Sequence, residues 1–574
     1  MEPQYLDALV VGAGFGGIYQ LKKLLDRNLH VKAIDMAGDV GGTWYWNRYP
    51  GALSDTQSFL YRYSWDLEDL RSYPWKTHYL EGPEILAYLK HMVEKYDLRK
   101  HFQFNTELLS AKWREEERRW VVTLSTDEVL KVKYLITGLG LLSKTNWPKI
   151  PNMQSFQGEL YHTARWPDGV DLKGKRVGII GNGSTGVQLI TAIAKADEVK
   201  QLLSFQRNPQ YSVPAGNGPV SAESRKRLND SYEEVWDQAK KSLFAYGFQE
   251  STRPTFSVTP AQREQIYEDA WQKGNGFRFM FWTFDDITVN EEANKAAAEF
   301  IKKKIRQTVK DPEKARKLCP REFYARRPLC DTGYYEQFNR DNVDVVDIKT
   351  NPITEFTPNG IKTAEGKIYE LDVVICATGF DAVDGSYTRI AIQGRSGESL
   401  KAHWAKNGPT SYLGICVPNF PNLFMICGPN GPFSNLPPAI ETHVEIISDL
   451  IAIAETDPAR LVRAVNTSCE AISINGGGHR NGHASGRPTS HGIIEAEAEA
   501  EEDWTGLCDQ LSSKSLFRKI ETSWIFGANV PGKKAVPMFW FGGLGPYRRA
   551  VQEIYDDDLR GFRKFDAQPE RAVL

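Results

Sequence analysis

The sequence has little of what marks disulfide-linked, membrane-spanning or nucleic-acid-binding proteins. Its 574 residues include seven cysteines, and none forms a closely spaced pair, which argues against a zinc site and a redox dithiol. No run of about 18 apolar residues is present to span a membrane. Lys and Arg number 71 against 73 Asp and Glu, so no excess of one charge indicates a nucleic-acid partner.

These absences predict a cytoplasmic protein with reduced thiols and neither a membrane nor a nucleic-acid partner. The first apolar run begins near residue 6, which leaves no room for a signal peptide before it. The length allows several domain cores, and we expect a monomer. Residues 475–492 are rich in Gly and His but hold no Cys or acid, so we expect a flexible loop and no metal site. The acidic residues 495–503 are interpreted as a solvated helix.

Two glycine-rich motifs are the most informative features present. The first contains Gly12, Gly14 and Gly17 and lies between an apolar run, residues 6–11, and a helical pattern, residues 18–25. The free N–H groups and the positive end of such a helix favour a pyrophosphate. The next predicted strand ends at Asp35, 23 residues after Gly12, where a carboxylate can accept hydrogen bonds from a ribose.

The second motif differs from the first at the corresponding acid. It follows the apolar residues 175–180 and consists of Gly181, Gly183, Ser184, Thr185 and Gly186. The next predicted strand, residues 201–205, leads to Arg207 and has no carboxylate, so Arg207 could pair with a 2′-phosphate. The alternative is an arginine that only caps a strand at the surface. Two such motifs in one chain indicate FAD at the first and NADP(H) at the second.

Longer signatures accompany these motifs and carry a resemblance to a known family. They are Phe156-x-Gly158-x-x-x-His162-x-x-x-Trp166-Pro167 and the segments 41–55, 325–335 and 523–533. On these residues the sequence resembles the Baeyer–Villiger monooxygenases, and within them the branch that oxidises cyclic ketones. The resemblance extends over about residues 6–565.

The resemblance implies an α/β fold with two Rossmann-like dinucleotide-binding domains and a helical insertion. Residues 1–147 and 384–574 would form a discontinuous FAD-binding domain. Residues 148–215 and 328–383 would form the NADP-binding domain, interrupted by the helical insertion, residues 216–327.

The family's chemistry is also implied by the resemblance. NADPH reduces FAD, the reduced flavin reacts with O2 to give a C4a-peroxyflavin, and this attacks a small-molecule ketone to yield an ester or lactone. An anionic peroxide needs a permanent cation, and arginine keeps its charge in any environment. Arg327 matches that cation, and Asp55 would hold it in place. The alternative is that the two residues form a structural salt bridge.

The remaining site residues are assigned by the same resemblance. Residues on the flavin side would be Gly42, Thr43, Trp44, Trp46 and Tyr49. Arg326 stands where relatives often carry Lys and would share the 2′-phosphate with Arg207. Trp524 would lie near the nicotinamide ribose. His162 and Trp166 would belong to a linker that senses NADP and sets domain closure. Ordinary packing remains the alternative for the aromatic residues, and a hydrogen-bonded core histidine remains the alternative for His162.

Three other classes of protein share part of this pattern. A flavin-containing N- or S-oxygenase shares both glycine motifs, but it usually lacks the Trp166-Pro167 ending and it lacks a counterpart of Arg327. A flavin disulfide reductase needs a close cysteine pair. An NADPH sensor with the same fold would need no oxygen chemistry. The sequence leaves open which ketone reacts.

Overall fold

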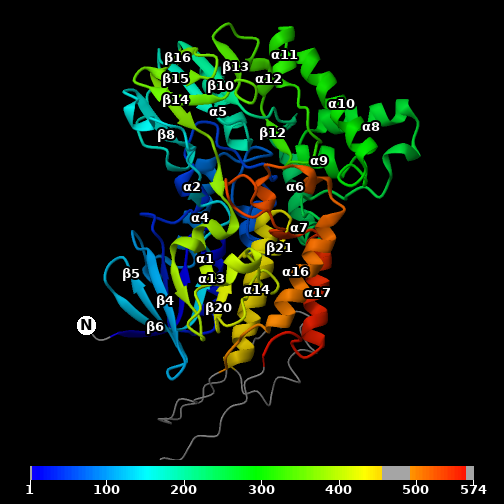
Figure 1. Cartoon of the computed structure of the whole chain (residues 1–574). Helices are drawn as coiled ribbons and strands as arrows, with labels where there is room; N and C mark the ends of the chain where they lie inside the picture. The colour runs from blue at the N-terminus through cyan, green and yellow to red at the C-terminus, as the bar shows by residue number, and fades with distance from the viewer. Residues whose placement is uncertain (1–2, 456–491, 564–574) are drawn as a thin grey trace, which may run out of the picture.

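Each glycine-rich motif joins a strand to a helix, and each does so in a sheet of its own. The computed structural model describes residues 3–455 and 492–563. In it β1 (Gln4–Val11) leads into α1 (Phe15–Leu25), and β9 (Arg176–Ile180) leads into α5 (Ser184–Ala196). Figure 1 shows α1 in a lower lobe and α5 in an upper lobe. The expected α/β fold with two Rossmann-like units is confirmed.

The sheet of the lower lobe is assembled from distant parts of the chain. Its strands run in the order β19-β4-β5-β6-β1-β2-β3, and β20 also pairs with β6. Around β1 the pairing is parallel, whereas β4, β5 and β6 form an antiparallel meander. The other strands are β2 (Val31–Ile34), β3 (Phe102–Gln103), β4 (Leu108–Arg114), β5 (Arg119–Leu124), β6 (Val129–Thr137), β19 (Ala391–Gln393) and β20 (Leu423–Met425).

The sheet of the upper lobe is parallel throughout. Its order is β13-β10-β9-β17-β8, and its other strands are β8 (Glu159–His162), β10 (Gln201–Gln206), β13 (Val343–Asp347) and β17 (Val373–Cys376). The segment that the sequence presents as a linker therefore supplies an edge strand, β8, followed by the turn that carries Trp166.

Short strands complete the two lobes. One small antiparallel sheet joins β14 (Ile353–Thr357), β15 (Gly360–Thr363) and β16 (Ile368–Glu370). Three further pairs are β11 (Ser212–Pro214) with β12 (Leu329–Asp331), β7 (Lys144–Thr145) with β18 (Phe380–Asp381), and β21 (Gly431–Pro432) with β22 (Phe539–Trp540).

The expected helices within residues 216–327 are present, and several begin at residues suited to capping. Thr259 and Gln262 form a capping box at the start of α8, and the side chain of Asn290 accepts two backbone N–H groups of α10. Such caps satisfy donors that a helix leaves unpaired. The helices are α6 (Ala222–Asp230), α7 (Tyr232–Lys241), α8 (Pro260–Lys273), α9 (Gly276–Phe281), α10 (Glu291–Thr308) and α11 (Pro312–Leu318).

The remaining helices belong mostly to the lower lobe. They are α2 (Thr43–Trp46), α3 (Leu67–Ser72), α4 (Gly82–Lys95), α12 (Tyr334–Gln337), α13 (Leu400–Asn407), α14 (Leu436–Glu455), α16 (Ala498–Ser513) and α17 (Leu544–Asp556). Gln20 of α1 donates from Nε2 to Ser448 Oγ of α14 at 3.1 Å, so the helix after the first glycine motif packs on the long C-terminal helix. Within the described ranges, no helix is long and apolar enough to cross a bilayer.

The interpretation of residues 495–503 as a solvated helix holds for only part of the segment, because Glu499, Glu502 and Asp503 are exposed on α16 whereas Glu495 and Glu501 are buried. The helix α16 begins only at Ala498, and the side chain of Glu495 is 1% exposed, where it accepts a hydrogen bond from Arg395 Nη1 at 2.6 Å. Glu501 is also buried and contacts His403 at 2.9 Å. Basic partners distant in the sequence thus hold two of these acids inside the molecule. Of the predicted loop 475–492, residues 475–491 lie outside the described residues.

Candidate functional site

In both glycine motifs the last glycine packs closely against the protein, whereas the middle glycine has open space beside it. A Cβ on Gly17 would lie 1.8 Å from the carbonyl oxygen of Gly12, and one on Gly186 would lie 2.2 Å from that of Gly181. These outer positions are filled by the protein itself. The middle positions differ, because a Cβ on Gly183 would meet nothing within 4 Å and one on Gly14 meets only Gly42. Each loop therefore keeps room at its middle glycine, beside a helix N-terminus, where a pyrophosphate fits.

Asp35 closes the first motif as predicted from its spacing. Its Oδ2 accepts from the backbone N–H of Ala13 at 2.6 Å, and its Oδ1 accepts from that of Ala37 at 2.7 Å. Burial raises the pKa of Asp35, and these two backbone hydrogen bonds oppose the rise. The carboxylate is thus tied to the glycine loop, and its remaining lone pairs can accept hydroxyl groups of a ribose. That role stays a prediction.

The segments that carry Arg207 and Arg326 meet near the second motif, because Asn182 Nδ2 donates to the carbonyl oxygen of Asn208 at 3.0 Å and Lys349 contacts both Asn208 and Glu322. Burial, and then the positive charge of Arg326, lower the pKa of Arg207. Arg326 donates from Nη2 to Glu322 at 2.6 Å and to Thr522 Oγ1 at 3.0 Å. The Arg207 side chain forms no hydrogen bond within the part of the chain that the structure describes, and the residue is exposed. A pair of arginines with one group free of such bonds suits a doubly charged phosphate.

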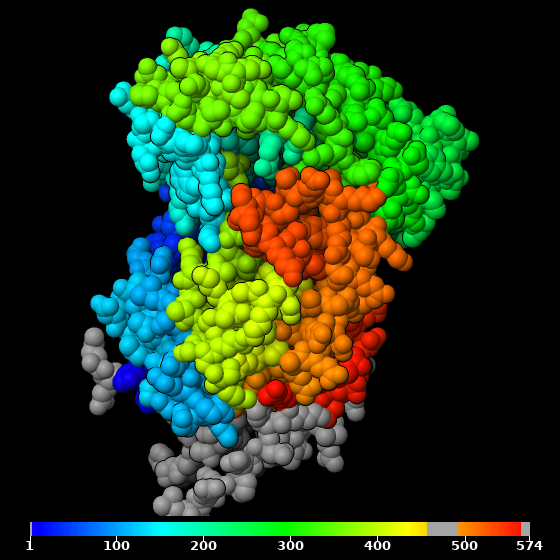
Figure 2. Space-filling model, viewed as in Figure 1, coloured from blue at the N-terminus to red at the C-terminus, as the bar shows by residue number. Residues whose placement is uncertain are grey.

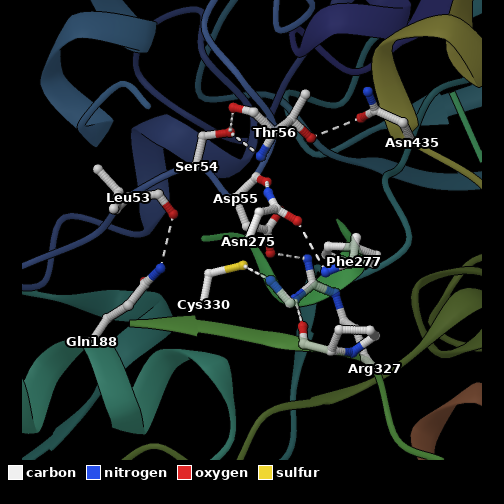
Figure 3. A network of polar contacts seen from close by, with 12 residues as sticks. Leu53, Ser54, Asp55, Thr56, Gln188, Asn275, Phe277, Arg327, Cys330 and Asn435 are labelled. Carbon is white, nitrogen blue, oxygen red and sulfur yellow. Dashed lines mark hydrogen bonds and ion pairs between the residues drawn. The ribbon is translucent and has the colours of Figure 1, made fainter. Parts of the chain in front are cut away.

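Arg327 and Asp55 form an ion pair between segments 272 residues apart. Asp55 lies on the loop after α2, and Arg327 stands just before β12. Figure 3 shows their side chains pointing toward one another, with Asn275 donating from Nδ2 to the carbonyl oxygen of Asp55 at 2.9 Å. The Arg327 side chain remains 28% exposed, against 15% for Asp55. Asp55 therefore holds the Arg327 guanidinium in place, and part of the Arg327 side chain stays accessible to solvent.

The surroundings keep Arg327 charged. Burial by itself lowers the pKa of Arg327, but the negative charge of Asp55, followed by the influence of Tyr246, raises it above its ordinary value. The guanidinium carbon also lies 5.2 Å from the centre of the Phe277 ring, a favourable cation–π distance. The fold thus supplies a fixed positive charge next to aromatic surface.

Of the predicted flavin-side residues, Gly42 lies against the first motif. Gly42 approaches Gly14 so closely that a Cβ on Gly42 would lie 2.8 Å from the Gly14 Cα. Thr43 is exposed at the start of α2, whereas the buried Trp44 donates from Nε1 to the Tyr61 hydroxyl at 3.1 Å. Trp46 is half-buried, with the guanidinium carbon of Arg165 3.9 Å from its ring centre.

Tyr49 connects the two lobes. Its hydroxyl donates to Gln188 Oε1 on α5 at 2.8 Å, and Gln188 Nε2 donates to the carbonyl oxygen of Leu53 at 2.9 Å. Burial raises the pKa of Tyr49 to about 12, although a hydrogen bond with Thr185 opposes the rise. The helix after the second motif is therefore tied to the loop that carries Asp55.

The signature residues on either side of β8 pack within the upper lobe. Phe156 contacts Phe356 edge to face at 5.8 Å, and a Cβ on Gly158 would lie 2.4 Å from the carbonyl oxygen of Asp372. Trp166 is buried and lies 5.9 Å from the ring of Tyr161. These positions have a clear packing role, so their part in sensing NADP stays a prediction.

His162 is a buried, neutral histidine. Its Nδ1 accepts from the backbone N–H of Ala164 at 3.2 Å, while its Nε2 is buried without a hydrogen bond. Burial, and then the charge of Arg165, lower the pKa of His162 to about 4. Trp147 lies over it at 5.1 Å between ring centres. The hydrogen-bonded core histidine that sequence reasoning kept as an alternative is thus compatible with this geometry.

Trp524 lies on the segment between the lobes. It is half-buried, and its ring meets that of Phe539 edge to face at 5.9 Å. Figure 2 shows the C-terminal residues in orange at the face where the upper and lower lobes meet. This place is compatible with a contact to a nicotinamide ribose, which stays a prediction.

Comparison with known proteins gives the family. A family model described as "Flavin-binding monooxygenase-like" matches residues 7–210. A Baeyer–Villiger monooxygenase from Pseudooceanicola batsensis is 49% identical, covering 96% of this chain and 95% of its own. The crystal structure of cyclohexanone monooxygenase from Rhodococcus sp. Phi1 bound to NADP+ is 50% identical, covers 98% of this chain and 99% of its own, and has a TM-score of 0.90.

The chain belongs to the Baeyer–Villiger monooxygenases. The resemblance read from the signatures is confirmed. Phenazine N-monooxygenase PhzNO1 from Lysobacter antibioticus is nearly as similar, with 45% identity over 98% of this chain and 97% of its own. Membership of this family therefore does not by itself fix the atom that is oxidised.

Several residues around the Asp55–Arg327 pair of this Baeyer–Villiger monooxygenase are not predicted by the sequence analysis. Asn275 holds the backbone of Asp55, and Asn435 Oδ1 accepts from Thr56 Oγ1 at 2.8 Å. Tyr246 and Phe277 stack beside Arg327. For Asn275 a local signal existed, because an Asn before Gly276 and an apolar run is a typical helix N-cap. For the others no local pattern indicates the contact, which depends on segments far apart in the sequence.

Proposed function

We propose that this protein holds FAD at the first glycine motif and NADPH at the second, and that it converts ketones into esters or lactones with O2. The observation that carries the proposal is the Asp55–Arg327 pair, a fixed cation whose aspartate lies on the loop that Gln188 of α5 contacts through Leu53 (Figure 3). Domain limits at residues 147–148, 215–216, 327–328 and 383–384 belong to the same proposal.

When bound, NADPH supplies a hydride and the reduced flavin activates dioxygen. The chain's own residues then have to hold negative charge. Arg327 is a permanent donor with a rigid fork, suited to stabilise charge that develops on an oxygen of the reacting ketone. Asp55 orients that fork and limits the net charge of the site, so that Arg327 stays in one position through the reaction.

The preference for NADPH follows from the arginine pair. Arg207 and Arg326 offer several N–H donors to a 2′-phosphate, and the second motif has no carboxylate at the corresponding position to repel it. Losing one such charge-assisted contact costs about 1.5–3 kcal/mol, so NADH should bind roughly tenfold to a hundredfold more weakly.

The second candidate function is N-oxygenation, favoured by the similarity to a phenazine N-monooxygenase. An amine or heteroaromatic nitrogen attacks an oxygen donor directly and builds no oxyanion on the substrate carbon. Such a reaction has less use for a fixed cation beside the substrate, which is why the Arg327 site favours ketones.

A substrate panel decides between the two. The purified protein should be yellow and should consume NADPH faster in the presence of linear, cyclic or aryl ketones, with one atom of isotopically labelled dioxygen in the ester. Tertiary amines and phenazines form the second arm. N-oxides without any ester would reject the ketone proposal, and a colourless protein that gains no flavin on reconstitution would reject both.

We also propose that the protein works in the cytoplasm as a monomer. The six cysteines within the described ranges are all free, which suits a reducing compartment. Fractionation of the source cells and sedimentation of the purified protein test the two parts separately.

A further inference from the structure

Four buried or half-buried phenols surround the Asp55–Arg327 pair, and one differs from the rest. Besides burial, the negative charge of Asp55 contributes to raising the pKa of each of them. The three whose hydroxyl groups have hydrogen-bond partners are Tyr49, Tyr61 and Tyr79. The hydroxyl of Tyr246 has no hydrogen bond within the described part of the chain. It is also not one of the fully buried polar atoms without a partner, so its oxygen keeps solvent-accessible surface.

A ring stack places Tyr246 beside the cation. Its ring lies parallel to that of Phe277, with 4.1 Å between centres and 21° between planes. The Phe277 ring in turn lies 5.2 Å from the guanidinium carbon of Arg327. Tyr246 as a whole is only 8% exposed, so its ring is fixed by packing while its hydroxyl remains available.

The backbone before Tyr246 is held in an unfavourable conformation. Ala245 has a φ of 57°, a region that a residue with a Cβ rarely adopts. Its N–H donates to Ser242 Oγ at 3.0 Å, and its carbonyl oxygen accepts from Asn435 Nδ2 at 2.8 Å. The same Asn435 accepts from Thr56, next to Asp55 (Figure 3). One asparagine therefore positions both the Tyr246 turn and the Asp55 loop. Strained backbone conformations persist at functional sites when surrounding contacts of this kind maintain them.

Tyr246 can serve as a donor over the whole useful pH range. Burial, and then the negative charge of Asp55, raise its pKa well above the ordinary value for a phenol. The hydroxyl keeps its proton, and a carbonyl or developing oxyanion is the acceptor that such a donor fits.

We propose that Tyr246 donates a hydrogen bond to the carbonyl oxygen of the ketone, on the side of the substrate that faces Arg327. This inference rests on the proposed ketone oxidation. The bond strengthens as the oxygen gains negative charge during addition, and it transfers no proton. Tyr246 is then a specificity-determining residue that favours substrates with an exposed acceptor oxygen over apolar molecules of the same shape.

The test removes the hydroxyl and keeps the ring. In Tyr246→Phe we expect kcat/KM for cyclohexanone, or for the best ketone of the panel, to fall about tenfold to a hundredfold. Flavin content and the rate of flavin reduction by NADPH should stay within about twofold of wild type, because the substitution leaves both glycine motifs untouched. The matched control is Tyr267→Phe in α8, which removes a hydroxyl that, unlike that of Tyr246, is fully buried, and should leave every rate unchanged.

An apolar isostere separates a hydrogen bond from a packing effect. Methylenecyclohexane has the shape of cyclohexanone without the carbonyl oxygen, so its inhibition constant should be the same for wild type and Tyr246→Phe. If ketone and isostere weaken together, or if kcat/KM for the ketone is unchanged, the proposal is wrong. Failure of the proposed function looks different, since the wild type itself would then make no ester.

Discussion

At the residue scale, the charge of Arg327 is the property on which the proposed oxygenation depends most. A guanidinium cannot lose its proton inside a protein, whereas a buried lysine can, and only arginine offers two parallel donors to fixed oxygens. Asp55 accepts a hydrogen bond from one N–H group of Arg327. Because 28% of the Arg327 side chain is exposed, other N–H groups remain free to contact a reacting oxygen. Hydride delivery makes no comparable demand on this residue.

Arg327→Ala should therefore separate the two halves of the reaction. NADPH should still bleach the flavin, although more slowly, while ester formation falls by about 2.7–4 kcal/mol in activation free energy, roughly a hundredfold to a thousandfold. NADPH consumption would then yield hydrogen peroxide. Stopped-flow absorbance measures the first half, and product analysis with peroxide assay measures the second. Arg327→Lys should recover only part of the loss, and ester formation at wild-type rates in Arg327→Ala would refute the assigned role.

At the element scale, each strand–loop–helix unit works because its middle glycine leaves space. Gly14→Val should abolish flavin retention, since the new side chain would occupy the position of the pyrophosphate. Gly183→Val should keep the flavin and raise the KM for NADPH by about tenfold to a hundredfold. Gly506→Val, at an exposed glycine of α16 with nothing within 4 Å of its Cβ, is the matched control. Flavin absorbance and NADPH titration test all three, and loss of flavin in Gly183→Val would contradict the assignment of the two motifs.

A second element-scale contact makes stability depend on pH. His403 of α13 meets Glu501 of α16 at 2.9 Å and Glu398 at 3.5 Å. Burial alone lowers the pKa of His403, but these carboxylates raise it above the unfolded value. A raised folded pKa stabilises the protein fully below the unfolded pKa, and the contribution disappears as pH rises through the folded pKa. His403→Gln should thus lower Tm more at about pH 6 than at about pH 8.5. The control is His30→Gln, at an exposed histidine. If His403→Gln lowers Tm equally at both pH values, the protonation of His403 does not stabilise the protein.

At the scale of the whole molecule, the sequence predicts best what is local. The glycine loops and their flanking strands could be recognised because a few neighbouring residues determine them. The pairing of Arg327 with Asp55, across 272 residues, came only from resemblance to a family. The contact of Asn435 with Thr56 spans 379 residues, and the burial of Glu495 depends on Arg395, 100 residues away. No local pattern encodes such partners, so neighbouring residues predict neither the burial of Glu495 nor the position of the Tyr246 turn.

The segment that carries Trp524 is fastened across the junction of the lobes by Lys533. Its Nζ donates to Asp381 Oδ1 at 2.8 Å, to Asp384, and to the carbonyl oxygen of Ala382 at 3.3 Å. Both carboxylates are largely buried, with 14% and 11% of their side chains exposed. Lys144 also pairs with Asp381, at 2.9 Å, so Asp384 is the acid that depends most on Lys533.

Lys533→Met should loosen this segment without disturbing the flavin. Burial already raises the pKa of Asp384 and Lys533 opposes the rise, so removal of the lysine leaves an unpaired acid that favours opening. A lost charge-assisted contact costs about 1.5–3 kcal/mol, which should raise the KM for NADPH and speed proteolysis near residues 527–536, with flavin content unchanged. Adding Asp384→Asn to Lys533→Met should recover part of both effects, because the double variant no longer buries an uncompensated charge. If the single variant shows wild-type NADPH kinetics and wild-type proteolysis, Lys533 does not fasten the segment, and the position of Trp524 is set by packing against Phe539 alone.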